Sequence, residues 1–107
     1  MNSEGVLIDR SAGTATVIAS GEIDMMVVTR FEAALTQALG SRCPDLRVDA
    51  SDVQFFGSEG VRSLLKAEEL ALEQGTRLSV VNASRTVRVV LKICDLERLL
   101  HPASDSE

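Results

Sequence analysis

Apolar positions along the chain alternate between two spacings, one typical of strands and the other of amphipathic helices. Short apolar or β-branched runs predict strands over residues 6–8, 14–20, 46–50 and 77–81. Apolar residues three and four positions apart predict helices over 27–39, 61–72 and 87–94, with a last helical turn over 96–100. The predicted order of elements is therefore β-β-α-β-α-β-α.

Polar and glycine residues between these runs indicate how the elements join. A turn over 11–13 makes the first two strands an antiparallel hairpin, and Gly21 is expected to end the second strand. Asp24 is expected to cap the first helix, and the third strand is expected to continue loosely through 53–56 as strand plus exit loop. Because helices separate the later strands, parallel pairing is favoured. The sequence predicts an α/β fold, a single-domain mixed β-sheet with its helices packed on one face.

The length of 107 residues and the 45% share of hydrophobic residues fit one globular domain. We expect this domain to span 1–107, with a core over about 6–100 and a flexible tail over 101–107. Glu4 and Asp9 precede any apolar core, so no signal peptide is expected. No apolar run approaches the ~20 residues of a membrane span. The chain is therefore predicted to be cytoplasmic, without direct membrane insertion.

Charge and aromatic content argue against nucleic-acid binding. Lys and Arg number 11 against 16 Asp and Glu, and this net charge of −5 disfavours contact with a phosphate backbone. Aromatic residues make up 3% of the chain, with no Trp or Tyr for base stacking. Cys43 and Cys94 form neither a CxxC pair nor a zinc ligand set. They are expected to be small buried residues in a reducing cytosol, with a redox-sensing disulfide as the alternative.

The predicted topology places a loop and a helix N-terminus after the carboxyl end of each parallel strand, where α/β sheets usually bind ligands and partners. Three such loops, over 21–24, 56–60 and 82–84, are expected to converge there. Helix N-termini present unpaired N–H groups and a partial positive charge, which suit a phosphate group. The sequence thus predicts a binding site at this end of the sheet.

Ser58 lies in the second of these loops, directly after Gly57. One interpretation is an N-cap serine, and the other is a hydroxyl displayed for modification or catalysis. A serine nucleophile needs a general base, but the only histidine, His101, falls in the predicted tail. The spacing around Ser58 does not match the G-x-S-x-G elbow, and a Ser–Lys pair with Lys66 or Lys92 stays open.

No metal site, cofactor or enzymatic activity is predicted. The carboxylates expected near the same end of the sheet are those of Asp24, Asp49, Asp52 and Glu59. Aspartate is common in caps and turns, so these residues are interpreted as structural rather than as metal ligands. The chain also has no glycine-rich nucleotide-binding loop.

Four segments resemble the motifs of STAS domains. Residues 21–24 (GEID) resemble the G-E-x-D signature of the family, and 46–56 are similar to its strand-D-x-S-x-V-x-F segment. Residues 57–61 (GSEGV) lie where the family usually has D-S-S/T-G-L, and 74–82 are similar to its G-x-x-L-x-L-V strand. The order and spacing of these segments extend the resemblance from about Val6 to Leu100.

The resemblance implies the role of a bacterial anti-sigma factor antagonist. Such a protein binds an anti-sigma factor, often itself a serine kinase, and so releases the sigma factor. Phosphorylation of the antagonist reverses the binding, and a phosphatase resets it. By motif position, Ser58 would be the phosphorylated residue. The residues implied in partner binding are Glu22, Asp24, Gly57, Ser58, Glu59, Gly60 and Arg62.

Simple electrostatics agrees with a switch that acts on the surface. A phosphate adds about −1.5 to −2 charges at pH 7, and a helix N-terminus tolerates that charge, so the fold is expected to persist. At an interface beside Asp24 and Glu59, the same charge must be desolvated. A loss of roughly 2–4 kcal/mol corresponds to binding about 30- to 1000-fold weaker.

The sequence departs from the family pattern beside Ser58. Gly57 replaces a common Asp, which removes a carboxylate that would orient the hydroxyl, and Glu59 replaces a common Ser or Thr, which adds a negative charge next to the acceptor. The alternative role within the family is an accessory subunit of a membrane transporter, such as a lipid-trafficking ABC system, which needs no phosphoserine. The third hypothesis is an enzyme or small-ligand sensor acting at the strand ends.

Overall fold

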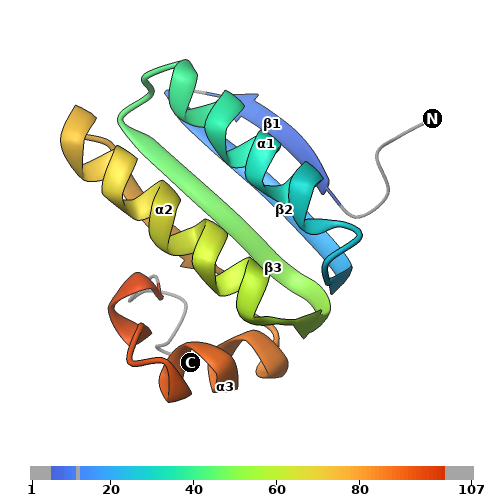
Figure 1. Ribbon diagram of the computed structural model, residues 1–107. Helices are drawn as coiled ribbons and strands as arrows, with labels where there is room; N and C mark the ends of the chain where they lie inside the picture. Colours follow the sequence, from blue (N-terminus) through green and yellow to red (C-terminus); the bar gives the residue numbers. More distant parts are fainter. Residues whose placement is uncertain (1–5, 12, 101–107) are drawn as a thin grey trace.

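A computed structural model describes residues 6–11 and 13–100 and contains a four-stranded sheet with three α-helices (Figure 1). The elements in chain order are β1 (Val6–Ser11), β2 (Thr14–Ile23), α1 (Val28–Gly40), β3 (Asp45–Phe56), α2 (Ser58–Gln74), β4 (Arg77–Val81), α3 (Arg85–Ile93) and the 3-10 helix η1 (Glu97–Leu99). The predicted order of strands and helices is confirmed. The expected tail over 101–107 and residues 1–5 lie outside the described residues.

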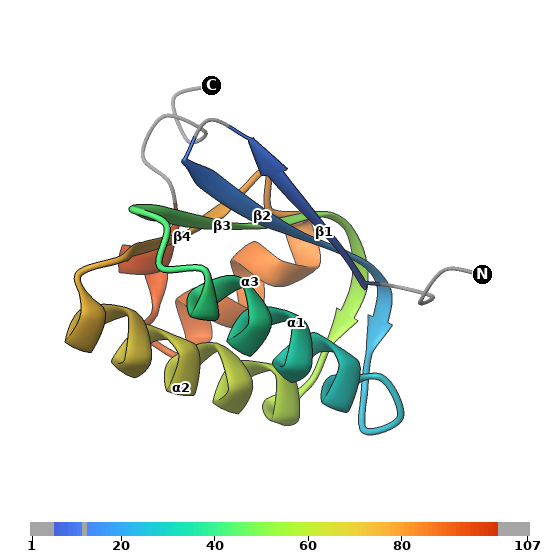
Figure 2. The same ribbon diagram turned by 90° about the horizontal axis from the view of Figure 1, so that it is seen from above.

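The sheet has the strand order β1-β2-β3-β4. β1 and β2 form the predicted antiparallel hairpin, and β2, β3 and β4 run parallel. All three α-helices lie on one side of the sheet, as predicted, and the other side is open (Figure 2). Successive side chains of β3 point to opposite sides of the sheet. Leu46, Val48 and Ala50 face the helices and are buried, whereas Arg47 faces the open side and is exposed. Over residues 6–11 and 13–100, no helix has the length and apolarity needed to cross a membrane.

Gly21 does not end β2, contrary to the prediction, because the strand continues to Ile23. The φ of Gly21 is +78°, a conformation that glycine adopts without steric cost. The pairing with β3 shifts in register between Ile18 and Ser20 and again between Gly21 and Glu22. The backbone therefore changes register at this point and still remains in the sheet.

β3 is one regular strand of 12 residues, so residues 53–56, expected as a loose continuation with an exit loop, belong wholly to the strand. Val53 and Phe56 are buried, and Phe56 pairs with Ile23 of the extended β2. The irregular apolar spacing after Ala50 reflects the register shifts, which change the residues that face the helices. The two long strands place their following loops at one end of the molecule.

An aromatic contact lies beneath those loops. Phe31 of α1 and Phe56 of β3 are buried and meet edge to face, with ring centroids 6.0 Å apart and ring planes at 87°. A Cβ atom added at Gly60 would lie 2.8 Å from Cε1 of Phe56. Because glycine has no side chain, α2 can begin directly against the Phe56 ring.

Gly60→Ala is expected to lower the free energy of unfolding by about 1 kcal/mol. The added methyl group overlaps the Phe56 ring, and overpacking of this kind costs ~1–3 kcal/mol, partly offset by the ~1 kcal/mol higher helix propensity of alanine. Urea unfolding followed by circular dichroism measures the change. Gly40→Ala is the control, since a Cβ at Gly40 meets nothing within 4 Å. Equal stabilities of the two variants would contradict the packing role of Gly60.

Neither cysteine is fully buried, so the expectation of two buried thiols is wrong. Cys43 is half-buried, and its thiol donates a hydrogen bond to the carbonyl oxygen of Asp45 at 3.2 Å. Cys94 is exposed because α3 ends at Ile93 and Cys94 occupies the C-cap, outside the buried stripe of the helix. Both residues are free thiols.

Candidate functional site

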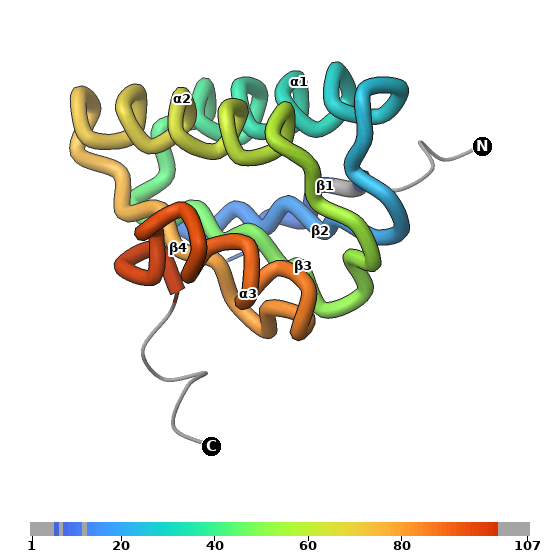
Figure 3. The backbone as a smooth tube through the Cα atoms, turned by 60° about the horizontal axis from the view of Figure 1, so that its bottom comes forward, coloured from blue at the N-terminus to red at the C-terminus, as the bar shows by residue number. Residues whose placement is uncertain are grey.

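Two loops meet at the carboxyl ends of β2 and β3. The backbone N–H of Gly57, after β3, donates a hydrogen bond to the carbonyl oxygen of Ile23, at the end of β2, at 3.4 Å. The loop between β2 and α1 therefore lies beside the loop between β3 and α2, and Figure 3 shows both at the same end of the backbone. The sequence predicted this pairing of loops.

The third predicted loop, 82–84, does not join them. The N–H of Ser84 donates to the carbonyl oxygen of Ala50 at 3.0 Å, and its hydroxyl donates to that of Val53 at 2.7 Å. β3 continues past both positions to Phe56, whereas β4 ends at Val81. The expected convergence of three loops is therefore wrong. β3 is longer than β4, so the loop that follows β4 lies beside the middle of β3 and not at its end.

Ser58 is exposed and is the first residue of α2. The N-cap is Gly57, with φ −87° and ψ −177°, so the interpretation of Ser58 as the N-cap is wrong. The hydroxyl of Ser58 makes no hydrogen bond to any of the described residues. Ser58 is therefore available to solvent or to a visiting protein.

Asp24 organises the neighbouring loop but is not the N-cap of α1. Its Oδ1 accepts hydrogen bonds from the N–H groups of Met26 at 3.0 Å and Val27 at 3.2 Å. Its carbonyl oxygen accepts one from the N–H of Val28 at 2.8 Å. The N-cap itself is Val27, since a turn over residues 25–27 separates Asp24 from the helix. The Asp24 carboxylate thus fixes this turn at the same end of the sheet as Ser58.

The other predicted partner-binding residues differ in exposure. Glu22 is exposed and lies opposite Phe55 across the β2–β3 pair. Gly57 and Glu59 are half-buried, and Gly60 is buried. A Cβ atom at Gly57 would lie 3.1 Å from Cε2 of Phe55 and 3.4 Å from Oε1 of Glu59. A side chain at position 57 would therefore begin in tight contact with the Phe55 ring and in ordinary contact with the Glu59 carboxylate.

Arg62 is exposed and follows Ser58 by four residues in α2. Side chains four apart lie on the same face of a helix, so Arg62 and Ser58 are neighbours on its surface. Arg62 is thus a cation within the reach of any group attached to Ser58.

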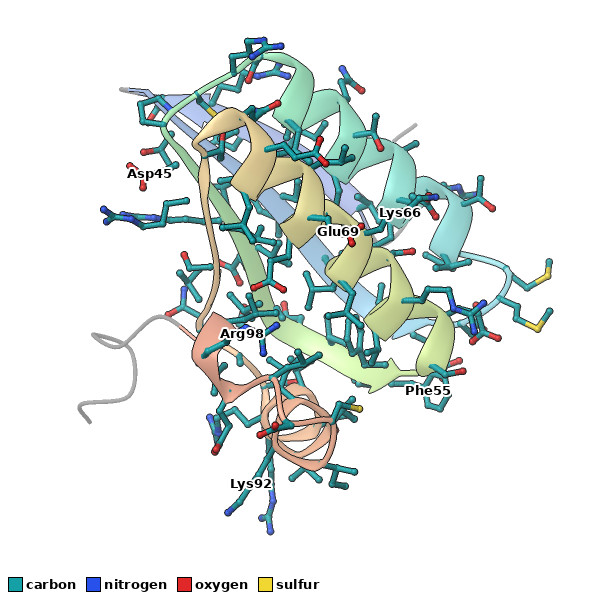
Figure 4. All side chains as sticks on the ribbon, turned by 60° about the vertical axis from the view of Figure 1, so that its left-hand side comes forward. Asp45, Phe55, Lys66, Glu69, Lys92 and Arg98 are labelled. Carbon is teal, nitrogen blue, oxygen red and sulfur yellow. The ribbon has the colours of Figure 1, made fainter. Side chains whose placement is uncertain are left out.

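Exposed apolar side chains at this end were missed by the sequence analysis. Met25 is 72% exposed, Met26 is 83% exposed and Phe55 is 49% exposed. Figure 4 shows Phe55 at the end of β3. An adjacent pair of methionines just before a helical stripe was the available signal, but sequence periodicity assigns no exposure to a turn. We define the strand-end surface as Glu22, Asp24, Met25, Met26, Phe55, Ser58 and Glu59.

The described residues place neither a general base nor a set of metal ligands around Ser58. Lys66 forms an ion pair with Glu32 at 2.8 Å, and Lys92 projects from α3 (Figure 4), so neither lysine hydrogen-bonds to Ser58. Asp49 accepts hydrogen bonds from Ser51 and Asn82 partway along β3, away from the strand-end surface. Among the residues that the structure describes, no group of His, Cys, Asp or Glu is suited to hold a metal ion.

The Glu32–Lys66 contact joins α1 to α2 beside the site. Ser63 Oγ also donates to Glu32 Oε1 at 3.2 Å. The hydrogen bond from Lys66 and the positive charge of Lys66 lower the pKa of the Glu32 carboxyl. Any stability from this contact is present above the ordinary pKa of glutamate and is lost as the pH falls through the lowered value.

A groove of about 660 Å³ extends along α2 from the strand-end surface. Its lining residues are Val28, Glu32, Glu59, Arg62, Ser63, Leu65, Lys66, Glu68 and Glu69. Six of these nine residues are charged and two are aliphatic, so the groove resembles the polar rim of an interface more than its apolar centre. Figure 4 shows Lys66 between α2 and α1, where it pairs with Glu32.

Comparison with protein families identifies the fold. A family model described as "Mlab, STAS domain" matches residues 6–101. The chain belongs to the STAS domain family. Comparison of this STAS domain with curated protein sequences gives no match.

Solved structures similar to this STAS domain include anti-sigma factor antagonists. An antagonist from Mycobacterium paratuberculosis shares 30% sequence identity, with a TM-score of 0.77 over 89% of this chain and 80% of that chain. SpoIIAA in its unphosphorylated form has 20% identity and a TM-score of 0.79, over 90% of this chain and 85% of that one. Bacillus SpoIIAA in the phosphorylated form has 19% identity and a TM-score of 0.73, over 90% and 88%. The two SpoIIAA structures support the fold.

Proposed function

We propose that this STAS domain is a cytoplasmic anti-sigma factor antagonist without enzymatic activity. Its strand-end surface would bind an anti-sigma factor and so release the sigma factor. The similarity to the Mycobacterium paratuberculosis antagonist, at 30% identity over 89% of this chain, supports this role. The single observation on which the proposal depends is the exposed Ser58, without a hydrogen-bond partner among the described residues, next to exposed apolar side chains.

The strand-end surface has the composition of a protein-binding site. Met25, Met26 and Phe55 supply apolar area that is open to solvent, and methionine adapts to irregular partner surfaces. Glu22, Asp24 and Glu59 border these residues with negative charge. The complementary surface on the anti-sigma factor would therefore be apolar with a basic rim.

Phosphorylation of Ser58 by a kinase-type anti-sigma factor would reverse the binding, and a phosphatase would restore it. The Ser58 hydroxyl faces solvent at the first position of α2, so a phosphate would need no change in the core. It would add about two negative charges to a surface that is already acidic. If Ser58 faces the apolar part of the partner and not its basic rim, the phosphate would have to be desolvated without a cation against it, which opposes association.

The phosphorylation assignment is tested by mixing the protein with its anti-sigma factor and ATP and measuring the intact mass. We expect the wild-type protein to gain one phosphate and Ser58→Ala to gain none. Equal phosphorylation of Ser58→Ala, or none of the wild type, would reject Ser58 as the acceptor. Binding of the unphosphorylated protein to the anti-sigma factor, measured by calorimetry, tests the antagonist role separately.

Arg62 is expected to pair with the phosphate of phosphoserine 58. A charged i, i+4 pair is worth about 0.4 kcal/mol, which corresponds to a change of about 0.3 in the second pKa of the phosphate. Arg62→Gln should therefore raise that pKa, as followed by phosphorus NMR on protein with phosphoserine incorporated during translation. Arg47→Gln, on the open side of the sheet, is the control and should leave the value unchanged.

The accessory-subunit role remains the second candidate because of Gly57 and Glu59. Gly57 lacks the usual aspartate and Glu59 adds a negative charge next to Ser58, and a role that needs no phosphoserine is compatible with both departures. Genes for a permease and an ATPase beside this one, and co-purification with their products, would favour that role. A neighbouring kinase and sigma factor gene would favour the antagonist.

A further inference from the structure

The outer face of α3 differs in charge from the rest of the molecule. Its exposed residues are Arg85, Arg88, Val89, Lys92 and Ile93, which we call the α3 face. They recur at intervals of three and four residues and therefore share one side of the helix. Val89 is 47% exposed and Ile93 is 77% exposed. Figure 4 shows Lys92 extending away from the body of the protein.

The cations of the α3 face form no ion pair with an acidic residue within 6–11 and 13–100. The ion pairs of lysine and arginine that the structure gives for 6–11 and 13–100 involve Lys66, Arg77 and Arg98, on other elements. Arg88 donates one hydrogen bond to the carbonyl oxygen of Ala83 at 3.0 Å, a neutral group. The segment Arg85–Ile93 contains no acidic residue, although the whole chain has a net charge of −5.

The strand-end surface is complementary to the α3 face in both charge and polarity. Acidic Glu22, Asp24 and Glu59 border the exposed Met25, Met26 and Phe55. The α3 face places cations beside exposed Val89 and Ile93 in a similar mixed pattern. Opposite charges around two apolar patches favour their association and fix its orientation.

We infer that the α3 face of one copy of this chain binds the strand-end surface of another copy. The two surfaces lie on different elements, so each molecule can use both at once, and the contact is heterologous. Such a contact would cover Ser58, and under the proposed function self-association would then compete with the anti-sigma factor. Only this consequence rests on the proposed function.

A second copy suits the α3 face better than an anionic bilayer does. An extended negative surface would approach the acidic body of the domain as well as α3, and the net charge of −5 would oppose that approach. A second copy offers negative charge over a small area only. A nine-residue helix is about 13.5 Å long, so each contact buries less than the ~1,200 Å² of a standard interface, and the association is weak and transient.

Sedimentation velocity across a concentration series tests the inference without an anti-sigma factor, so its failure is separate from that of the proposed function. We expect the wild-type protein to associate reversibly, and less at high salt. Arg88→Glu/Lys92→Glu should associate about tenfold more weakly, and Glu22→Lys/Glu59→Lys should behave likewise. Circular dichroism checks that each variant is folded.

Mixing the two charge-reversed variants gives the sharpest result. The reversed α3 face of the first would meet the reversed strand-end surface of the second, so the mixture should associate more tightly than either variant alone. Arg42→Glu/Arg47→Glu is the control, because it changes the net charge as much as Arg88→Glu/Lys92→Glu does, at exposed residues away from both surfaces. We expect it to associate like the wild-type protein. If net charge alone governed association, it would instead associate as weakly as Arg88→Glu/Lys92→Glu. That result, or a monomeric wild-type protein, would overturn the inference.

Vesicles provide the remaining comparison. Wild-type protein is expected to bind neither neutral phosphatidylcholine vesicles nor vesicles with added phosphatidylserine. Binding to the anionic vesicles that Arg88→Glu/Lys92→Glu abolishes would assign the α3 face to a bilayer and reject the second copy as its occupant.

Discussion

Phosphoserine at position 58 is expected to weaken binding to the anti-sigma factor about 30- to 1000-fold, a loss of roughly 2–4 kcal/mol. Ser58 is exposed and Glu59 follows it directly, so a phosphate at the proposed interface would have to be desolvated next to an existing negative charge. Arg62 would neutralise only part of it. The thermal unfolding temperature should change little, because the phosphate touches no buried group and lies at a helix N-terminus.

Calorimetric titration of phosphoserine-containing protein with the anti-sigma factor measures this loss. Ser58→Ala should bind like the wild-type protein, since the hydroxyl has no hydrogen bond to any described residue. Phosphoserine in place of exposed Gln37 of α1 adds the same charge away from the site and should leave binding within about threefold. Similar losses at both positions would show that net charge, and not the strand-end surface, controls the complex.

Phe56→Ala is expected to lower the free energy of unfolding by about 3–5 kcal/mol, the usual cost of removing a buried aromatic ring. Phe56 is 7% exposed and contacts Phe31 edge to face. Its neighbour Phe55 is 49% exposed, so Phe55→Ala should cost less than about 1 kcal/mol. Binding should show the reverse order, because Phe55 belongs to the strand-end surface.

Urea unfolding and calorimetric binding together test this pair of adjacent phenylalanines. Phe56→Leu retains an apolar side chain and should recover most of the lost stability. Phe55→Ala is expected to keep the wild-type midpoint in urea but bind the anti-sigma factor at least about tenfold more weakly. A large stability loss with Phe55→Ala would place that ring in the core and remove it from the proposed interface.

The sequence predicted the fold wherever one period of apolar residues persisted. The stripe that includes Phe31, Leu35 and Leu39 identified α1, and each of these side chains is buried. Asp24 and Ser58 were placed at one end of the sheet because the carboxyl ends of parallel strands share an edge. The structure brings their two loops together.

The failures occurred where pairing between strands overrides local signals. A glycine after an apolar run normally marks the end of a strand. At Gly21, however, the positive φ accompanies a shift in register, and β2 continues against β3. The position of Ser84 depends on the length of β3, which no local signal near Ser84 contains. The exposure of Met25 and Met26 follows from a turn held by Asp24, and an apolar residue in a turn has no periodicity to interpret.

The edge-to-face contact between Phe31 and Phe56 joins α1 to the end of β3 directly beneath the loops that they support. Close packing of this kind resists small displacements, so both loops are held in one relative position by the core. The exposed side chains above contribute little to that support. Evolution can therefore exchange Met25, Met26 or Phe55 one at a time to suit a new partner, while the platform that displays them is preserved.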